Sequence, residues 1–498
     1  MFRQHVVTQL SASSIFKIHI MHFIDIIIFI IYFAVMLGVG IYFFKKNKNI
    51  EDYYIGGKSL GSWHIGLSVV ATDVGGGFSI GLGGLGFTIG LAGSWMLFTG
   101  LIGAWLSAVV LIPIVSKLSV KHKFFTFPQI FEHFYNSKVA LIAGIISAIG
   151  YIGFTSSQFL AGAKLASATF VDIDLFTALI IMGVIAVIYT GIGGLKAVIY
   201  TDTIQWIILM SGFIFIGIPL TYYAIGGIDT IKATLGSEFL SLGNIHWQQL
   251  VNWGITIIPI WFVGMTLYQR IYASKSEKHA RKSWFIAGLF EWPLMAFMGV
   301  TLGLFSRVAF ENGMFADIGY SLSAGMDPEM GLPVLLNTVL PVGLMGLMLS
   351  AYFSAVLSTA DSCLMAASGN VQTDILSKLF KFKQDQKSQL LASQIITLSI
   401  GALALLLASY MTNVLELMLY SYAFMVSGLF IPILVALYGK KPNSLAAILS
   451  MIIGGTTTVA LIISNLHLPF DLDANIFGIT ASAIVYFSIT FIYKKAAK

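Results

Sequence analysis

Cysteine is almost missing from this chain, because Cys363 is the only one among 498 residues. A single thiol cannot form an internal disulfide, and it cannot build a metal cluster of several cysteines. Charged residues are also scarce, at 10%, whereas a soluble domain usually carries about 25%. With 57% hydrophobic residues and a mean hydropathy of +0.88, the composition indicates a protein that is surrounded by lipid.

The basic residues do not indicate a nucleic-acid partner, although the net charge is +6. They lie in short clusters beside apolar segments, where lipid headgroups and the orientation of the segments account for them. Residues 1–21 are mildly basic and too polar for the core of a signal peptide. We interpret them as an N-terminal tail, or as the result of a start codon assigned upstream of Met21.

Long apolar segments recur along the whole chain, and a helix that spans a bilayer needs about 20 such residues. A window of about 19 residues predicts about thirteen membrane-spanning helices. Their expected positions are 22–44, 63–90, 93–116, 138–169, 174–195, 199–226, 250–271, 283–308, 335–374, 389–410, 413–437, 443–464 and 472–493. The predicted fold class is therefore an all-α polytopic membrane protein.

Every second loop between these segments is basic, and the loops between them are acidic or neutral. This alternation follows the positive-inside rule, which predicts an N-terminus outside and a C-terminus in the cytoplasm, in the plasma (inner) membrane. No linker rich in proline or serine divides the chain, so we expect a single domain over 22–498. Segments two to six begin inside and segments seven to eleven begin outside, which permits an inverted repeat over about 63–437.

The second segment contains ATDVGGGFS, in which Asp73 lies just before three consecutive glycines. Each glycine costs about 1 kcal/mol relative to alanine inside a helix, so we expect the helix to break here. Broken backbone in a bilayer offers free carbonyls to a cation and free amides to a solute. Close helix packing by small residues would explain the glycines alone. An intramembrane carboxylate, however, is rare and usually functional, so we predict a binding site.

The ninth segment contains SAVLSTADSCLMAAS, which places the hydroxyls of Ser358, Thr359 and Ser362 beside Asp361. Isolated serines often only bond to their own helix. Several hydroxyls beside a carboxylate instead suit a hard cation. An unpaired Asp361 would cost on the order of 3 kcal/mol at this depth. We therefore expect sodium, a proton or a basic partner there.

A third polar element, GGLKAVIYTDTIQW, leads from a predicted cytoplasmic loop into the sixth segment. Asp202 and Gln205 lie one turn apart near the inner face. Two interpretations stay open, namely capping of a helix start and a role in ion release.

These stretches resemble the sodium/solute symporter family, whose members transport proline, pantothenate, choline, sugars or sialic acid. The resemblance covers nearly the whole chain from about residue 22 onward. It rests on five motifs in the family's order, EDYYIGGKSLGSW (51–63), GGLKAVIYTDTIQ (193–205), YQRIYASKS (268–276), AVLSTADS (355–362) and LELMLYSYAFMVSGLFIPIL (415–434).

The resemblance implies a five-plus-five inverted repeat, with one extra helix before it and two after it, and alternating access coupled to sodium. Sodium is the only expected cofactor. The implied sodium ligands are the carbonyls of Ala71, Val74 and Ala355 and the hydroxyls of Ser358 and Thr359, with Asp73 in support.

Some relatives hold a second sodium, and the resemblance places that site at Asp202, Asp361 and Ser362, together with Ser358. Asp361 departs from the pattern, because those relatives carry a hydroxyl there. A protonated or charge-paired Asp361 is therefore an equal alternative.

The solute pocket is expected between the broken second segment and the fourth, seventh and eleventh segments. Ordinary packing and the interfacial belt explain most aromatic residues of such a protein, and we interpret Glu291 and Glu416 only as supporting groups. The candidate substrate-binding residues are Gly75, Gly76, Phe78, Gln158, Trp261, Tyr420 and Tyr422.

We therefore predict sodium-coupled symport of a small organic solute into the cell, with an amino acid or a small carboxylate favoured. An uncoupled channel or facilitator, or a solute sensor on the same fold, is the alternative. The sequence has no nucleophile–base pair, no His/Cys metal spacing and no phosphate loop, so we do not expect an enzyme. The expected partners are the solute, sodium and the lipid bilayer.

Overall fold

The computed structural model describes residues 22–44, 60–170, 173–380, 386–439, 442–464 and 466–496. Over these ranges the chain is helical between short connections, and its only β pairing is an isolated bridge between Leu60 and Ser274. The predicted tail 1–21 and residues 51–59 of the first motif lie outside the described residues. The all-α prediction is confirmed.

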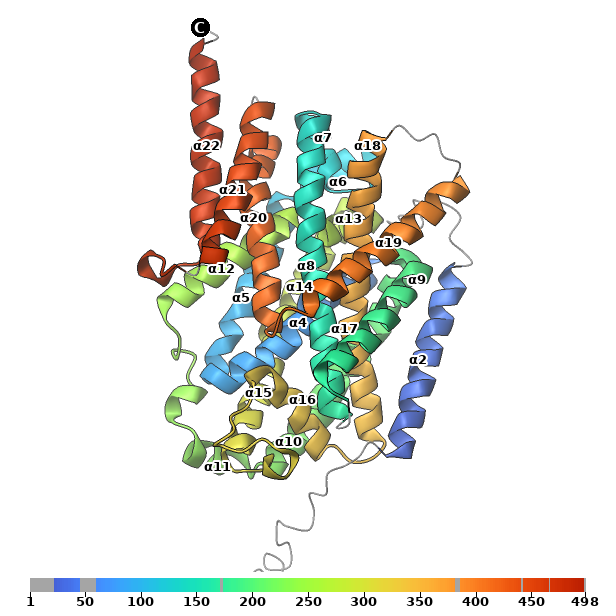
Figure 1. The fold of residues 1–498 in the computed structure, drawn as a ribbon, viewed down its shortest axis with the longest axis vertical. Coiled ribbons are helices and arrows are strands. Elements are labelled where there is room, and N and C mark those ends of the chain that lie inside the picture. Colours follow the sequence, from blue (N-terminus) through green and yellow to red (C-terminus); the bar gives the residue numbers. More distant parts are fainter. Residues whose placement is uncertain are drawn as a thin grey trace, which may run out of the picture.

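The helices form one bundle, in which most of the longer ones run roughly along the vertical axis of the view (Figure 1). The longer helices are α2 (Phe23–Phe44), α4 (Ser62–Ile89), α5 (Trp95–Val110), α6 (Ile112–His122), α8 (Ser137–Thr169), α9 (Leu175–Gly212), α12 (Trp247–Val263), α14 (Glu277–Leu289), α15 (Ala296–Glu311), α16 (Pro328–Val339), α17 (Leu344–Gly369), α19 (Gln386–Ala408), α20 (Val414–Tyr438), α21 (Ser444–Ser464) and α22 (Ala474–Ala496). The shorter ones are η2 (Gly90–Ser94), α7 (Pro128–Phe134), η3 (Phe213–Gly217), α10 (Ile218–Ala224), α11 (Gly227–Thr234), η4 (Ser237–Leu240), α13 (Met265–Ala273), η5 (Phe290–Met295), η6 (Ala316–Ile318), η7 (Asn370–Leu376), α18 (Ser377–Leu379) and η8 (Pro469–Asp471).

The helices are long and apolar enough for a membrane protein with many spans. In the described part of the chain, nine can cross a bilayer, or ten if the bent pair α12 and α13 is one span. Two shorter apolar stretches, Phe23–Val35 and Leu175–Ile188, lie where the first and fifth spans are expected. Helix is present in every predicted segment, and the count of about thirteen spans stays a prediction.

Two helices in the middle of the bundle are interrupted. α4 has helical backbone on both sides of Gly75, whose φ of 34° and ψ of −159° are not helical. Glycine reaches such a positive φ without steric cost, so the predicted break in the triple glycine is confirmed. α12 and α13 are separated by Gly264 and bend by 43°. Interrupted helices leave backbone groups free to bind ligands within a membrane.

The connection between the fifth and sixth predicted segments differs from the expectation. The positive-inside pattern predicts a loop near Lys196, but the backbone of α9 is helical from Leu175 to Gly212. The glycines at 191, 193 and 194 lower the helix propensity by about 1 kcal/mol each, and this does not prevent helical hydrogen bonding.

Two polar side chains of α9 make contacts that lead to α17. Thr190 donates a hydrogen bond to Asp361 of α17. Asp202 pairs with Arg270, and the Arg270 guanidinium also donates to Ser362 of α17. The contacts of Thr190 and Asp202 therefore lead to neighbouring positions of α17, directly for Thr190 and through Arg270 for Asp202.

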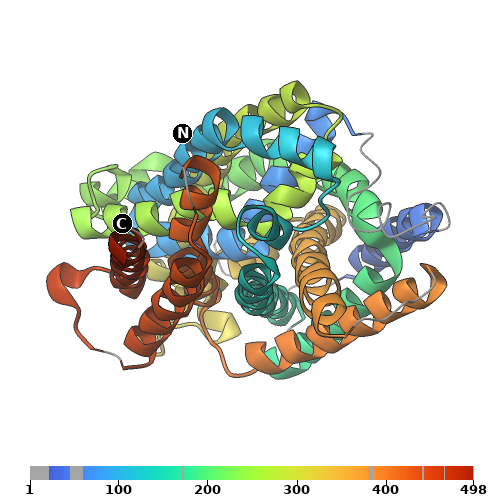
Figure 2. The same cartoon turned by 90° about the horizontal axis from the view of Figure 1, so that it is seen from above.

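Basic residues gather at one end of the bundle. Figure 1 shows α6, α7, α13 and α18 at that end and α10, α11 and α16 at the other. α6 carries Lys121 and His122 in its last turn, and α22 carries Lys494 and Lys495 in its last turn. Viewed from above, α2 and α22 lie at opposite edges of the bundle (Figure 2). This distribution is the one that the alternation of basic and neutral loops predicts, while the orientation in a membrane stays a prediction.

α2 is fastened to the start of α17. Asp25 is fully buried, and its Oδ1 accepts hydrogen bonds from the backbone N–H groups of Gly343 at 2.7 Å and Gly346 at 2.6 Å. The first N–H groups of a helix have no partner within it. A carboxylate from a distant helix therefore performs the capping that a local side chain usually provides.

Candidate functional site

The break in α4 lies against the hydroxyl-rich part of α17. A Cβ atom at Gly75 would lie 2.3 Å from Thr359 Oγ1, and one at Gly76 would lie 2.4 Å from Val356 Cγ2. Atoms cannot come this close, so glycine is what permits the two helices to approach. The expected meeting of the second and ninth segments is confirmed.

Four of the predicted sodium ligands are connected by short contacts between hydroxyls and carbonyls. Thr359 Oγ1 donates to the carbonyl of Ala71 at 2.8 Å and lies 3.3 Å from the carbonyl of Ala355. Ser358 Oγ donates to the same Ala355 carbonyl at 3.1 Å. Val74, the fifth predicted ligand, directly precedes the break at Gly75.

This cluster has the chemistry that sodium requires. Hard cations prefer carbonyl and hydroxyl oxygens, and all four residues of the cluster are buried between α4 and α17. The residues therefore fit the ion, and their role as its ligands stays a prediction.

Asp73 belongs to a different group of residues. It is 5% exposed, and its carboxyl contacts the Tyr422 hydroxyl on α20 and the carboxyl of Glu291 on η5. Asp73 and Ala71 are two residues apart, which separates them by about 200° around a helix axis. The residue predicted to support sodium thus faces a candidate substrate-binding residue, Tyr422.

The residues predicted for a second sodium take part in two sets of contacts. Thr190 donates to Asp361. Asp202 and Ser362 are bridged by Arg270, whose Nη2 lies 3.6 Å from Asp202 Oδ2 and 2.9 Å from Ser362 Oγ. A basic partner, Arg270, is therefore present, but it forms an ion pair with Asp202 and not with Asp361. A second sodium at these residues stays a prediction.

Arg270 is a site residue that the sequence reasoning missed. It lies on α13 and is fully buried. It donates to Ser68 Oγ and to the Thr266 carbonyl, both at 3.1 Å, and also to Thr72. The bend at Gly264 redirects α13 so that it packs on α4 and α17. The apolar residues around Arg270 in LYQRIYA are the one signal that could have indicated its burial.

A second buried ion cluster was not predicted either. Lys164 Nζ on α8 lies 2.6 Å from Asp327 Oδ2 and 2.6 Å from Glu329 Oε2. Glu329 also accepts hydrogen bonds from the backbone N–H groups of Val414 and Leu415, each at 2.9 Å. The cluster joins α8, α16 and the start of α20. Its members are far apart in the sequence, so no local pattern indicates it.

The break in α4 also gathers part of the predicted substrate-binding set. The backbone N–H of Gly76 donates to Gln158 Oε1 at 3.0 Å, and Gln158 is fully buried on α8. Tyr422 reaches Asp73 from α20. Gly75, Gly76, Gln158 and Tyr422 therefore surround one place in the bundle. The side chain of Phe78 lies outside the described part of the structure.

Trp261 lies on α12 and packs against α5, next to the turn that contacts Glu291. A Cβ atom at Gly103 of α5 would lie 2.3 Å from Trp261 Cδ1, and one at Gly100 would lie 2.3 Å from Glu291 Oε2. Gly100 and Gly103 are one helical turn apart. Trp261 and Glu291 therefore pack on neighbouring turns of α5.

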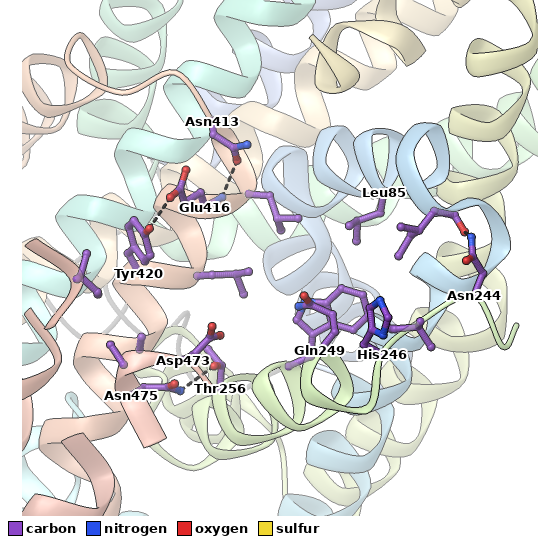
Figure 3. A pocket seen from close by; sticks show the side chains of 18 of the residues that line it. Leu85, Asn244, His246, Gln249, Thr256, Asn413, Glu416, Tyr420, Asp473 and Asn475 are labelled. Atoms are coloured by element: carbon purple, nitrogen blue, oxygen red, sulfur yellow. Dashed lines mark hydrogen bonds between the residues drawn. The ribbon is translucent and has the colours of Figure 1, made fainter. Parts of the chain in front are cut away.

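Tyr420 does not lie with the other candidates. It lines a pocket of about 690 Å³ between α12, α20 and α22, and it donates a hydrogen bond to Glu416. Figure 3 shows Glu416 and Tyr420 on one side of this pocket and Gln249 and His246 on another. Because Tyr420 and Tyr422 are two residues apart on one helix, they point about 200° apart, and they cannot line the same site.

A membrane-spanning bundle whose central helix is broken against a hydroxyl-bearing partner is the architecture of secondary transporters with discontinuous helices. Residues 53–454 of the chain match the Sodium:solute symporter family, and the chain belongs to that family. Its class of activity is thus sodium-coupled symport of a solute, and it is a transporter rather than an enzyme. Sodium is a transported ion in this class, which corrects the expectation that lists it as a cofactor.

Characterised relatives match almost the whole chain. The high-affinity proline transporter PutP of Bacillus subtilis (strain 168) is 27% identical, with 91% of this chain and 95% of the relative covered. A sodium/glucose cotransporter of Vibrio parahaemolyticus is 28% identical, with 91% and 87% covered.

Solved structures show the same fold. A substrate-bound, outward-open sodium-coupled sialic acid symporter matches with a TM-score of 0.76 at 23% identity, with 93% of this chain and 97% of that chain covered. Mhp1, a nucleobase-cation-symport-1 family transporter in a closed conformation, matches with a TM-score of 0.55 at 13% identity, with 89% and 95% covered.

Proposed function

We propose that this protein imports a small organic solute by alternating access, driven by sodium bound between α4 and α17. The ligands would be the carbonyls of Ala71, Val74 and Ala355 and the hydroxyls of Ser358 and Thr359. The observation that carries the proposal is the hydrogen bond between Thr359 Oγ1 and the Ala71 carbonyl, beside the break at Gly75. An ion that replaced this hydrogen bond would hold α4 and α17 together while the solute occupies the break.

Binding of sodium would favour the state in which α4 and α17 are in contact. A ligand shifts a conformational equilibrium only by its difference in affinity between the states. Because the proposed ligands come from both helices, the complete set exists only when the helices meet. Sodium would therefore bind before the solute and order the broken helix for it.

The remaining features of the proposal follow the predicted topology. We propose about thirteen spans in a single domain over 22–498, an inverted repeat over about 63–437, an outside N-terminus and a cytoplasmic C-terminus. Asp202, Asp361 and Ser362 would hold a second sodium. A sodium dependence of uptake with a Hill coefficient above one would support that second site, and a hyperbolic dependence would contradict it.

The solute is proposed to be an amino acid or a small carboxylate, bound by Gly75, Gly76, Gln158 and Tyr422 near the break. Relatives that transport proline and glucose match this chain about equally well, so the names of the relatives do not decide between solute classes.

The test is uptake into proteoliposomes that contain the purified protein, with labelled L-proline and D-glucose. An inward sodium gradient should drive accumulation above the outside concentration, and an equal potassium gradient should not. An uncoupled facilitator would only equilibrate the solute across the membrane, and a sensor would bind the solute without moving it. Either result would contradict the proposal.

A further inference from the structure

The pocket beside Tyr420 is a cavity that neither the proposed sodium site nor the break in α4 uses. Its volume of about 690 Å³ is within the range of sites for small organic ligands. It lies where α12, α20 and α22 begin, and Figure 3 shows polar side chains on several sides of it. The predicted topology places the beginnings of these three helices outside the cell, so we expect a ligand to enter from there.

This pocket is separate from the place at the break in α4. Tyr420 lines the pocket, whereas Tyr422 points about 200° away from it around the same helix. α4 and α20 also pack closely beside the pocket, because a Cβ atom at Gly81 would lie 2.9 Å from Leu415 Cβ. Gly81 is six residues, or about 9 Å of helix, beyond the break at Gly75. A ligand in the pocket therefore does not occupy the break.

Hydrogen bonds between α12 and the segment that leads into α22 hold one wall of the pocket in place. Asn252 donates from Nδ2 to the Asp471 carbonyl at 3.1 Å, and its Oδ1 accepts from the backbone N–H of Asp473 at 2.9 Å. Asn475 Nδ2 donates to Thr256 Oγ1 at 2.7 Å. These contacts fix Asp473 and Asn475 beside α12.

The same wall carries acceptors that are left free. Asn475 is fully buried and lines the pocket, and its Oδ1 has no hydrogen-bond partner in the described part of the structure. The hydrogen bonds found there for Asp473 are those of its backbone, so its carboxylate accepts none from the described residues. An unpaired buried acceptor is costly, and an N–H donor of a ligand would satisfy it.

Charge and aromatic rings define the class of ligand. The described residues that line the pocket include the carboxylates of Glu416 and Asp473 and neither a lysine nor an arginine. Trp253 and Tyr420 add aromatic rings to the lining. Carboxylates raise the local concentration of cations, and aromatic faces attract ammonium and quaternary ammonium groups in particular. The lining therefore fits a small organic cation better than an anion.

We propose that this pocket is a second, outer binding site, which takes a small organic cation or the ammonium group of a zwitterion. Asp473 and Glu416 supply its negative charge, and Asn475 Oδ1 accepts a hydrogen bond from the ligand. Tyr420 thereby has a binding role, although not at the break, where the sequence reasoning placed it. Because Leu85 of α4 and residues of α12 line the pocket, its occupant contacts the outer parts of both interrupted helices.

The experiment places a thiol in the pocket of the purified full chain. Cys363, the single native cysteine, is buried, so Gln249→Cys supplies a reactive thiol at a half-buried residue of the lining. The rate of its modification by a maleimide is measured with choline chloride or with 3,3-dimethylbutan-1-ol, in which carbon replaces the quaternary nitrogen. Sodium chloride at the same concentration is the ionic control. Ser323→Cys, which is exposed and does not line the pocket, is the control position.

We expect choline to slow the modification of Gln249→Cys and to leave that of Ser323→Cys unchanged. The neutral analogue and sodium chloride should not protect the pocket thiol. Equal protection by choline and its neutral analogue, protection by sodium chloride alone, or no protection at all would overturn the inference. A Gln249→Cys thiol that does not react with the maleimide would overturn it too, because the pocket would then be closed.

Two further changes separate this pocket from the break in α4. In the Gln249→Cys protein, Asp473→Asn should raise the choline concentration for half-maximal protection by about fivefold, the factor expected for loss of one partly solvated ion pair. The matched control is Asp317→Asn, which changes an exposed carboxylate outside the pocket. An unchanged concentration with Asp473→Asn would contradict the inference.

Gly75→Ala should leave the protection intact, because it alters the break and not the pocket. Loss of protection in this variant would show that choline acts at the break, and it would overturn the inference. The inference does not rest on the proposed sodium ligands. Absence of sodium-driven uptake would therefore count against the proposed function alone and would leave the protection by choline in place.

Discussion

At the scale of single residues, Thr359 has two functions in one position. Its hydroxyl joins α17 to α4 through the Ala71 carbonyl, and it is also a proposed ligand of the ion. A serine or threonine that bonds only within its own helix could not do this. The proposed coupling between ion and solute therefore depends on this contact between α4 and α17, beside a glycine that permits their close approach.

Thr359→Ala should raise the sodium concentration for half-maximal uptake by about tenfold, because loss of one ligand of about 1.4 kcal/mol changes affinity by that factor. Sodium titrations of uptake measure the effect. The control is Thr397→Ala on α19, since the Thr397 hydroxyl donates to the Ser393 carbonyl of its own helix at 2.8 Å. An unchanged sodium dependence in well-expressed Thr359→Ala protein would remove α17 from the sodium site.

Gly75→Ala should abolish sodium-driven uptake. The new Cβ would lie 2.3 Å from Thr359 Oγ1, and the φ of 34° disfavours any residue with a side chain. Gly254→Ala on α12 is the matched control, because the nearest atom to its Cβ is 3.9 Å away. Normal uptake by Gly75→Ala protein would show that the close approach at the break is dispensable.

The sequence predicted the break at Gly75 and the hydroxyls of α17 because both signals are local. Three glycines lower the stability of the helix at their own positions, and the hydroxyls beside a carboxylate lie within five consecutive residues. Arg270 and Lys164 could not be placed in this way, because their partners come from distant segments. The split between Tyr420 and Tyr422 follows from helix geometry, but only once both are known to lie on one unbroken helix.

At the scale of elements, the beginning of α20 depends on α16. The first N–H groups of a helix need acceptors, and Glu329 of α16 supplies them to Val414 and Leu415. The same carboxylate neutralises Lys164 of α8. Three helices thus share one acidic side chain, which is 5% exposed.

Glu329→Gln should destabilise the folded protein by about 3 kcal/mol, because it leaves the buried Lys164 with only one acidic partner. Asp327→Asn should cost less than about 1 kcal/mol, since the Asp327 side chain is 43% exposed and water screens its ion pair. Thermal unfolding of the two variants in one detergent gives the comparison. Equal losses of stability would show that the cluster does not anchor α20 through Glu329.

At the scale of the whole molecule, the arrangement of basic residues predicts the orientation of the bundle in the membrane. The end of the bundle that carries α6, α13 and α18 should face the cytoplasm. The basic turn that the sequence predicts near Lys196 lies within the helical backbone of α9. The sequence alone could not show that this turn stays helical.

Cysteine labelling tests the orientation, and the chain suits it because its single Cys363 is buried. In intact cells, a maleimide that cannot cross membranes should label Ser323→Cys, which lies at the end with α10 and α16. Lys275→Cys, at the other end, should react only after the membrane is permeabilised. Both positions are exposed in the structure. The opposite labelling pattern would invert the proposed topology.

The contact of Asp25 with Gly343 and Gly346 has a consequence for biosynthesis. The carboxylate leaves the ribosome 318 residues before its first partner, which at about 5 to 20 residues per second is a delay of about 16 to 64 s. Asp25 lies in the first turn of α2. Before α17 is synthesised, its carboxylate can therefore stay at the level of the lipid headgroups, where water solvates it. The protein would then complete its assembly late, when the nascent α17 arrives and draws this acidic end inward.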